Sequence, residues 1–288
     1  MSQKAFESEY LKMKFTKMQG IGNDYIYIDC FHETVDNPIE LAVKVSDRHF
    51  GIGGDGLVLI MPSDRADAKM KMFNADGSEA EMCGNAIRCV GKYLYEHQLT
   101  RKSLLTIETL SGIKQLKLLI VGEKVASVEV DMGIPEFKAS AIPVNISKEQ
   151  VVAETIEVNQ HRYHFTSVSI GNPHCVIFVP EITDSMVLTD GRALETHSLF
   201  PRKTNVEFVK VLAHDQIKMR VWERGSGETL ACGTGACAAV VAAILNGRTE
   251  NKVQVELRGG ALTIEWNRDD NHVYMTGPAV EVFQGEWP

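Results

Sequence analysis

Residues 74–85 read NADGSEAEMCGN, and residues 223–234 read ERGSGETLACGT. The two stretches align without a gap at a shift of 149 residues, the difference between positions 232 and 83. The pairs that are identical in this alignment are Glu79/Glu228, Cys83/Cys232 and Gly84/Gly233. Other segments keep the same shift, because 21–23 (IGN) falls on 170–172 (IGN) and the apolar run 57–60 falls on 206–209. Several matching blocks in one order predict two similar halves, each the size of one domain.

Each half contains one long helical pattern directly after its matched cysteine. We predict helices over Gly84–Glu96 and Gly233–Leu245, and the apolar run 236–245 predicts that the second helix is buried on all sides. Around these helices, short apolar runs separated by turn residues predict strands. The predicted strands are 15–18, 25–28, 57–61, 69–73, 104–108, 114–120 and 125–130. We therefore expect an α+β fold with two pseudo-symmetric domains, each an antiparallel β-sheet wrapped around a central helix.

The composition is that of a globular protein, with 288 residues of which 44% are hydrophobic and 24% charged. Acidic side chains outnumber basic ones by 38 to 30, which argues against nonspecific nucleic-acid binding, because that requires Lys and Arg to neutralise phosphates. The longest apolar run, 236–245, is about half of a bilayer span. The polar segment Met1 to Lys12 fits neither a signal nor a transit peptide, and we expect a frayed extension there. These features predict a cytoplasmic protein that binds a small molecule, with no nucleic acid and no membrane as partner.

The chain contains six cysteines, and no pair of them has the CxxC spacing typical of zinc or thioredoxin-like sites. A chain of this size without a dense cysteine framework predicts reduced thiols and no metal. Four of the six are interpreted as small hydrophobic residues of strands and helices: Cys30, Cys89, Cys175 and Cys237. The remaining pair, Cys83 and Cys232, is the pair that the repeat matches.

Each matched cysteine precedes a predicted helix. A helix N-terminus offers unpaired N–H groups and a partial positive charge, which lower the pKa of a thiol from about 8.5 toward neutrality. The same N–H groups can hold a carboxylate or a developing enolate oxygen. Two thiols that face each other across a cleft between two halves can remove a proton from one face of a carbon and return one to the opposite face. The pattern therefore predicts an enzyme that inverts a stereocentre, with Cys83 and Cys232 as its acid–base pair.

Several strings together resemble diaminopimelate epimerases, and the resemblance covers nearly all of the chain from Met13 onward. The strings are 22–24 (GND), 73–79 (FNADGSE), 82–85 (MCGN), 171–174 (GNPH), 223–225 (ERG) and 231–235 (ACGTG). The resemblance implies the two-domain fold of that family. It also implies interconversion of L,L- and meso-diaminopimelate without a cofactor, in the lysine and cell-wall pathway. The sequence leaves the oligomeric state open, with a homodimer as one option.

The resemblance also assigns residues. Cys83 and Cys232 resemble the catalytic cysteines, and His174 resembles a histidine that supports them. Residues that resemble the substrate-binding set are Asn23, Asn74, Gly84, Asn85, Asn172, Asn205, Glu223, Arg224, Gly233 and Thr234. Independently of the resemblance, Arg suits bidentate binding of a carboxylate, Glu suits an ammonium, and Asn both donates and accepts. Taken alone, Asn23 and Asn172 also fit turn positions, Glu223-Arg224 an exposed ion pair, and His174 a core histidine.

One residue departs from the family pattern, and one strand of that pattern affects where the domains divide. Gly56 stands where some members of the family have Gln, so one polar substrate contact has no equivalent here. In the family, the last strand crosses back to the first half. We therefore expect domains comprising 1–131 plus 278–288, carrying Cys83, and 132–277, carrying Cys232.

Other functions fit parts of the sequence. Residues 51–56 (GIGGDG) match GxGxxG, but a helical pattern precedes them and an apolar strand follows, which reverses the context of a dinucleotide site. A racemase or epimerase of another amino acid, of the proline or hydroxyproline type, would keep both cysteines. A disulfide between Cys83 and Cys232 would inactivate such a site. Pyridoxal phosphate would need a positioned lysine, which the sequence does not indicate, and a binding module alone would not need paired thiols.

Overall fold

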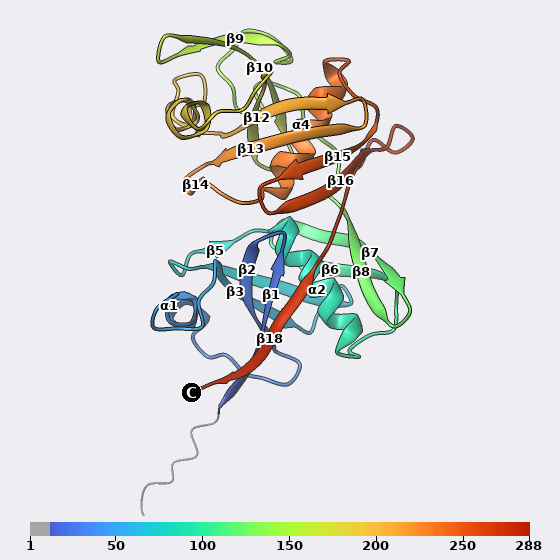
Figure 1. Cartoon of the computed structure of the whole chain (residues 1–288). Coiled ribbons are helices and arrows are strands. Elements are labelled where there is room, and N and C mark those ends of the chain that lie inside the picture. The colour runs from blue at the N-terminus through green and yellow to red at the C-terminus, as the bar shows by residue number, and fades with distance from the viewer. Residues whose placement is uncertain (1–11) are drawn as a thin grey trace, which may run out of the picture.

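The structure is a computed structural model that describes residues 12–288, so most of the expected extension, residues 1–11, lies outside the described residues. Figure 1 shows two lobes stacked one above the other, with the first part of the chain in the lower lobe. The elements of this first part are β1 (Met13–Gly20), β2 (Asn23–Asp29), α1 (Pro38–Ser46), β3 (Gly56–Met61), β4 (Ala68–Asn74), β5 (Glu79–Ala80), α2 (Gly84–Glu96), β6 (Leu104–Thr109), β7 (Gly112–Val121) and β8 (Lys124–Asp131).

The upper lobe is built from the second part of the chain, and the last strand returns to the lower lobe (Figure 1). The elements are β9 (Glu154–Val158), β10 (His161–Ser169), β11 (Pro173–Phe178), a π-helical turn (Met186–Asp190), α3 (Gly191–Glu195), β12 (Asn205–Ala213), β13 (Gln216–Glu223), β14 (Gly227–Glu228), α4 (Gly233–Leu245), β15 (Lys252–Leu257), β16 (Gly260–Trp266), β17 (Val273–Gly277) and β18 (Val280–Trp287).

The strand order confirms the predicted pseudo-symmetry. In the lower lobe β1, β2, β3, β4, β6, β7 and β8 are successive neighbours, and β10, β11, β12, β13, β15, β16 and β17 follow the same order in the upper lobe. The sheets are mixed, however, and not purely antiparallel as expected. Strands β2/β3, β4/β6, β11/β12 and β13/β15 run parallel, because a helical segment connects the two members of each pair.

The C-terminal strand completes the lower lobe. Strand β18 pairs with β1 in the position that β9 occupies beside β10 in the upper lobe. The lobes are also joined directly, because β8 and β17 pair in antiparallel orientation. This crossing strand agrees with a first domain made of 1–131 plus 278–288, a division that stays a prediction.

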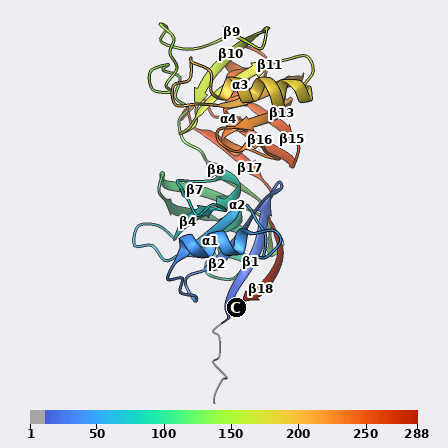
Figure 2. The same cartoon turned by 90° about the vertical axis from the view of Figure 1, so that its left-hand side faces the viewer.

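Each lobe wraps its sheet around one helix (Figure 2), and the bounds of both central helices are those predicted. In α4 every residue from Gly235 to Ala243 is buried, as the apolar run indicated. In α2 the burial is similar over Gly84–Gly91, although this segment includes Arg88, which is 0% exposed. Apolar residues of both helices belong to one continuous core, so the two lobes share their interior where the helices begin.

The glycine-rich segment 51–56 follows α1 and leads into β3, which is the reversed context noted from the sequence. Among residues 12–288, no helix has the length and hydropathy needed to cross a membrane.

Candidate active site

The two matched cysteines occupy the same position in the two lobes. Cys83 is the N-cap residue of α2 and Cys232 is the N-cap residue of α4. Their backbones are extended in the same way, with φ/ψ of −133°/120° and −122°/111°. Each thiol therefore stands at the end of a helix whose first N–H groups point toward it.

The two helix ends meet around one methionine. A Cβ atom on Gly84 would lie 2.7 Å from Met275 Cε, and one on Gly233 would lie 2.9 Å from Met275 Sδ. Any side chain at either position would displace Met275, so both glycines allow the helix ends to approach from opposite sides. Asn85 Nδ2 also donates to Ala231 O across the lobes at 3.3 Å.

The Asn23 side chain contacts the first thiol, Cys83, and the side chains of Asn85 and Asp55. It follows the β1–β2 turn, in which Gly22 has a φ of 88°, a value that favours glycine. Asn23 Oδ1 lies 3.3 Å from Cys83 Sγ and 3.5 Å from Asn85 Nδ2. Asn23 Nδ2 donates to Asp55 Oδ2 at 2.7 Å, so Asp55 fixes the orientation of this amide.

The second thiol is surrounded by other groups. The Gly235 N–H donates to Cys232 Sγ at 3.4 Å, and the Thr234 hydroxyl lies 3.5 Å from the same sulfur. The Glu223 carboxylate, which accepts from the Thr229 hydroxyl, also faces Cys232. Removal from water raises the pKa of Glu223.

The expectation that both thiols have a lowered pKa is wrong for this ligand-free structure. Removal from water raises the pKa of Cys83, although two N–H groups at the start of α2 oppose the rise. The pKa of Cys232 is raised further, by burial and by the carboxylates of Glu223 and Glu207. Desolvation of the thiolate therefore outweighs the helix end, a term that the sequence argument did not include.

His174 lies behind the second thiol, in a fully buried pair. His174 Nδ1 and Glu207 Oε1 are 2.7 Å apart, and both side chains are 0% exposed. His174 Nε2 lies 2.9 Å from Asn172 Oδ1. The pair comes from the parallel strands β11 and β12. His174 lies opposite Asn205, and Glu207 is two residues further along β12. The pair links the carboxylate beside Cys232 to the amide of Asn172.

A cleft of about 1320 Å³ lies between the lobes and reaches both thiols. It is large enough for a small amino acid and polar enough to bind one. Of the predicted site residues, those that line it are Asn23, Asn74, Cys83, Gly84, Asn85, Asn172, Glu223, Arg224, Cys232, Gly233 and Thr234. Both helix ends therefore open into a single site.

Comparison with known proteins gives the family of this chain. The family model described as diaminopimelate epimerase matches residues 15–138 and 166–282. The diaminopimelate epimerase of Acetivibrio thermocellus is 59% identical over 274 residues, covering 95% of this chain and 98% of that protein. A second relative of the same name, from Methanococcus maripaludis, is also 59% identical, with 95% and 99% covered. The chain belongs to the diaminopimelate epimerase family.

Solved structures show how widely this family's fold occurs. A phenazine biosynthesis protein of the PhzF family from Bacillus anthracis matches with a TM-score of 0.67 at 16% identity, covering 96% of this chain and 99% of that one. A hydroxyproline epimerase from Agrobacterium vitis matches with a TM-score of 0.67 at 14% identity, covering 96% and 90%. At these identities the likeness concerns the fold alone.

Two predicted site residues do not line the cleft of this family member. His174 is buried behind it, as described above. Asn205 is also buried, and its side chain is fully engaged: Oδ1 accepts from the Arg224 N–H at 2.9 Å, and Nδ2 donates to Pro173 O at 2.9 Å. In this structure Asn205 holds the backbone of Arg224, and direct contact with substrate stays a prediction.

The residue that departs from the diaminopimelate epimerase pattern, Gly56, has a structural explanation. A Cβ atom at position 56 would lie 2.0 Å from Phe73 O and 2.9 Å from Tyr25 Cε1. The space is therefore closed by backbone on one side and by the Tyr25 ring on the other. Tyr25 itself lines the cleft, so at this position an aromatic ring borders the site in place of a Gln side chain.

The structure adds residues that the sequence analysis did not select: Tyr25, Asp55, Arg88 and Glu207. Two of them carry a signal in the sequence, because Arg88 and Glu207 interrupt apolar runs in which a charge is unusual. Asp55 and Tyr25 do not, since their roles depend on the turn and register that bring them to Asn23 and Gly56.

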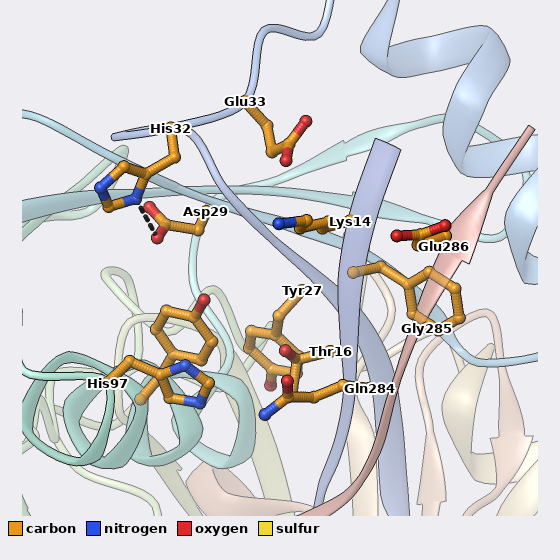
Figure 3. Close-up of a pocket in the computed structure, with 12 residues that line it drawn as sticks. Lys14, Thr16, Tyr27, Asp29, His32, Glu33, His97, Gln284, Gly285 and Glu286 are labelled. Carbon is orange, nitrogen blue, oxygen red and sulfur yellow. Dashed lines mark hydrogen bonds and ion pairs between the residues drawn. The ribbon is translucent and has the colours of Figure 1, made fainter. Parts of the chain in front are cut away.

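A second cavity, of about 570 Å³, lies on the lower lobe between β1, β2, α2 and β18 (Figure 3). Figure 3 shows His32 beside Asp29, with His32 Nδ1 and Asp29 Oδ2 2.8 Å apart, and Lys14 among the residues that line the cavity. None of the residues that line this cavity is a cysteine, and none belongs to a matched pair at a helix end. The candidate active site is therefore the cleft between the lobes.

Proposed function

We propose that this protein interconverts L,L- and meso-diaminopimelate by proton transfer between the α-carbon and the two thiols, Cys83 and Cys232, without a cofactor. The observation that carries the proposal is the placement of the two thiols at equivalent helix N-caps that open into one cleft. The family membership and the relatives' name supply the substrate.

The reaction balances on the two sulfur atoms. One cysteine begins as thiolate and takes the α-proton, which leaves a carbanion whose charge spreads into the α-carboxylate. The other cysteine begins as thiol and delivers its proton to the opposite face of the same carbon. The protein ends with the protonation states of the two thiols exchanged, and the reverse reaction restores them. The first N–H groups of α2 and α4 stabilise the enolate-like carboxylate between them.

The cleft offers complementary groups for a zwitterionic substrate with two amino acid heads. Arg224 is exposed at the cleft and, among residues 12–288, makes no ion pair. Its Nη1 donates to Arg202 O at 3.3 Å, and the rest of its guanidinium can bind a carboxylate. Glu223 is suited to an ammonium, and Asn23, Asn74 and Asn172 can each donate or accept. The proposed substrate-binding set is the set of cleft-lining residues named above other than the two cysteines, together with Asn205, and His174 is a supporting residue.

The principal alternative is a racemase or epimerase of another amino acid, of the proline or hydroxyproline type. The solved hydroxyproline epimerase has the same fold, and a two-thiol mechanism would serve either substrate. The identity of 59% to diaminopimelate epimerases, and a cleft bordered by Glu223 and Arg224, favour diaminopimelate.

The test is an assay of the purified chain with L,L-diaminopimelate, without added cofactor, in which the meso isomer is measured by chiral chromatography. L-Proline and trans-4-hydroxy-L-proline are assayed in parallel. We expect meso-diaminopimelate alone to form. Inversion of either imino acid with no conversion of diaminopimelate would transfer the function to the alternative.

Three further properties are proposed with the function. The product would enter lysine biosynthesis, the location would be cytoplasmic, and the assembly would be a homodimer. Exposed apolar side chains on β18 support an assembly: Val280, Val282 and Phe283 are 42%, 54% and 47% exposed. Sedimentation equilibrium measures the assembly, and a monomer at micromolar concentration would contradict it.

A further inference from the structure

The two lobes depart from their pseudo-symmetry at charged positions near the thiols. At the shift of 149 residues that relates the halves, Arg88 in α2 corresponds to Cys237 in α4 (237 minus 88). At the same shift, Val58 in β3 corresponds to Glu207 in β12 (207 minus 58). The added cation thus belongs to the half with the first thiol, and the added carboxylate to the half with the second.

Arg88 is a buried cation without a carboxylate partner. It is 0% exposed, and within the described part of the chain no ion pair reaches it. Its Nη1 donates to Gly84 O at 3.1 Å and to Asn85 Oδ1 at 3.0 Å, and its Nε donates to Pro278 O at 3.1 Å. Its Nη2 is buried with no hydrogen-bond partner. A buried charge without a counter-ion is costly, so an anion close to Arg88 would stabilise the protein.

Four ionisable side chains face Arg88: Cys83, Cys89, Tyr27 and Cys237. Burial raises the pKa of Cys89 to about 11 and that of Cys237 to about 12. Burial also raises the pKa of Tyr27 well above its usual value of 10.0. These three groups are therefore neutral near pH 7. Of the four groups, Cys83 is the one that lines the cleft, and it is the residue next to Gly84, whose carbonyl Arg88 binds.

The second thiol has carboxylates instead. Glu207 Oε1 lies 2.8 Å, and Cys232 Sγ 3.2 Å, from the point where a Cβ atom on Gly235 would stand, so the carboxylate and the thiol flank Gly235. Glu207 Oε1 is bound to His174, but Glu207 Oε2 is buried without a partner. These charges disfavour a thiolate at Cys232, although the Thr234 hydroxyl and the Gly235 N–H oppose them.

The remaining groups near the thiols do not reverse this difference. Glu223 faces both Cys83 and Cys232, but it is hydrogen-bonded to Cys232 and has the larger effect there, so its charge adds to the difference. Tyr25, from β2, also faces Cys83, and burial keeps its hydroxyl neutral by raising its pKa. The groups that differ between the two thiols are therefore the Arg88 guanidinium beside Cys83 and the carboxyl groups of Glu207 and Glu223 beside Cys232.

We propose that Arg88 is the fixed counter-charge that makes Cys83 the more acidic of the two thiols, so that when the pair holds a single proton, the thiolate is at Cys83 and the proton at Cys232. The inference rests on the proposed function, in which one cysteine must begin in each state. Arg88 acts through Cys83 and Asn85 and is a positioning residue. The state with a single proton is then ready for the isomer whose α-proton faces Cys83, and the reverse direction first requires the proton to move from Cys232 to Cys83.

The test titrates each thiol without substrate. Cys232→Ser and Cys83→Ser each leave one of the two thiols, and alkylation by iodoacetamide from pH 5 to 11 is measured on the peptide that carries it by mass spectrometry. The midpoint on the pH axis does not depend on how accessible the sulfur is. We expect the midpoint of Cys83 to lie at least about one pH unit, a tenfold change in equilibrium, below that of Cys232.

The role of Arg88 is tested in the Cys232→Ser protein. Arg88→Met should raise the Cys83 midpoint by about one pH unit or more, Arg88→Lys should restore much of it, and the exposed Arg248→Met control should leave it unchanged. Where Arg88→Met does not fold by circular dichroism, the comparison of the two thiols with Arg88 intact decides the question. A Cys83 midpoint at or above that of Cys232, or one that a folded Arg88→Met protein keeps, would overturn the assignment.

Failure of this inference and failure of the proposed function give different results. An inactive chain with the expected midpoints overturns the function and leaves the charge assignment in place. An active epimerase in which Cys232 has the lower midpoint supports the function and overturns the charge assignment.

Discussion

Tyr25 lies opposite Gly56 across the parallel strands β2 and β3, in the same register that places His174 opposite Asn205 in the other lobe. The repeat therefore extends to individual strand partners, since 174 minus 25 and 205 minus 56 both give 149. What differs is the chemistry: a buried histidine and an amide in one lobe correspond to a tyrosine ring and a glycine in the other.

The Tyr25–Gly56 contact predicts a stability effect. Gly56→Ala places a Cβ atom 2.0 Å from Phe73 O and 2.9 Å from Tyr25 Cε1, so a strand or the ring must move. We expect a loss of about 1–3 kcal/mol in the free energy of unfolding, as for other overpacked sites, measured by urea denaturation. Gly191→Ala is the control. Gly191 lies in α3, and a Cβ atom there would come no closer than 3.0 Å to its nearest neighbour, Trp222 Cβ. Equal stability of Gly56→Ala and the parent chain would show that the space is not closed.

Replacing either matched thiol should abolish epimerisation. Cys83→Ala and Cys232→Ala each remove one of the two acid–base groups, and such groups contribute about 10²–10⁴-fold to rate. We expect each single variant to lose at least about a thousandfold in kcat while folding normally. Cys30→Ala, at the residue that follows β2, is the matched control and should keep full activity. Retention of substantial activity by either variant would remove that cysteine from the mechanism.

The dependence of kcat/KM on pH should be bell-shaped. Activity falls at low pH when the required thiolate is protonated, and it falls at high pH when the required thiol loses its proton. Burial, Glu223 and Glu207 raise the pKa of Cys232, so Glu207→Gln should remove one of these contributions, lower that pKa and move the alkaline limb to lower pH. The acidic limb should move less. An alkaline limb that stays in place or moves upward would separate Glu207 from the titration of Cys232.

Arg224 should affect binding more than chemistry. Its guanidinium is exposed at the cleft, while its backbone N–H is held by Asn205, so Arg224→Ala removes the side chain without freeing the turn. Loss of a hydrogen-bonded charge predicts a decrease of about 10- to 100-fold in kcat/KM, mainly through a higher KM. Arg192→Ala, on the exposed side of α3, should be neutral. An unchanged KM in Arg224→Ala would exclude a substrate contact.

The central helices and their approximate bounds were predictable from the sequence. Gly after each cysteine and the helix-favouring, buried run 233–245 define them locally, and neither depends on distant parts of the chain. The mixed sheet was less accessible, because parallel pairing of β2 with β3 follows from how α1 returns the chain between them. Local periodicity contains no information about that connection.

The site was predictable where residues act alone and less so where they act in pairs. Cys83 and Cys232 emerged from the repeat, but the His174–Glu207 pair joins two strands whose parallel register had to be known. Asn205 was expected in the cleft, yet the structure engages both ends of its amide within the protein. Arg88 was overlooked because arginine in a helix is ordinarily a surface residue, and only its burial reveals its place beside the first thiol.

The central claim is that two thiols on opposite faces exchange protons with one carbon. The most direct measurement is incubation of the purified chain with L,L-diaminopimelate in D₂O, with the isotope content of substrate and product followed by NMR and mass spectrometry at early times. The account predicts meso product with one deuteron at the inverted α-carbon, because the thiol that delivers the proton has exchanged with solvent, while unreacted substrate remains unlabelled. Meso product that retains the original proton, or label entering the recovered substrate as fast as the product, would contradict a two-thiol mechanism.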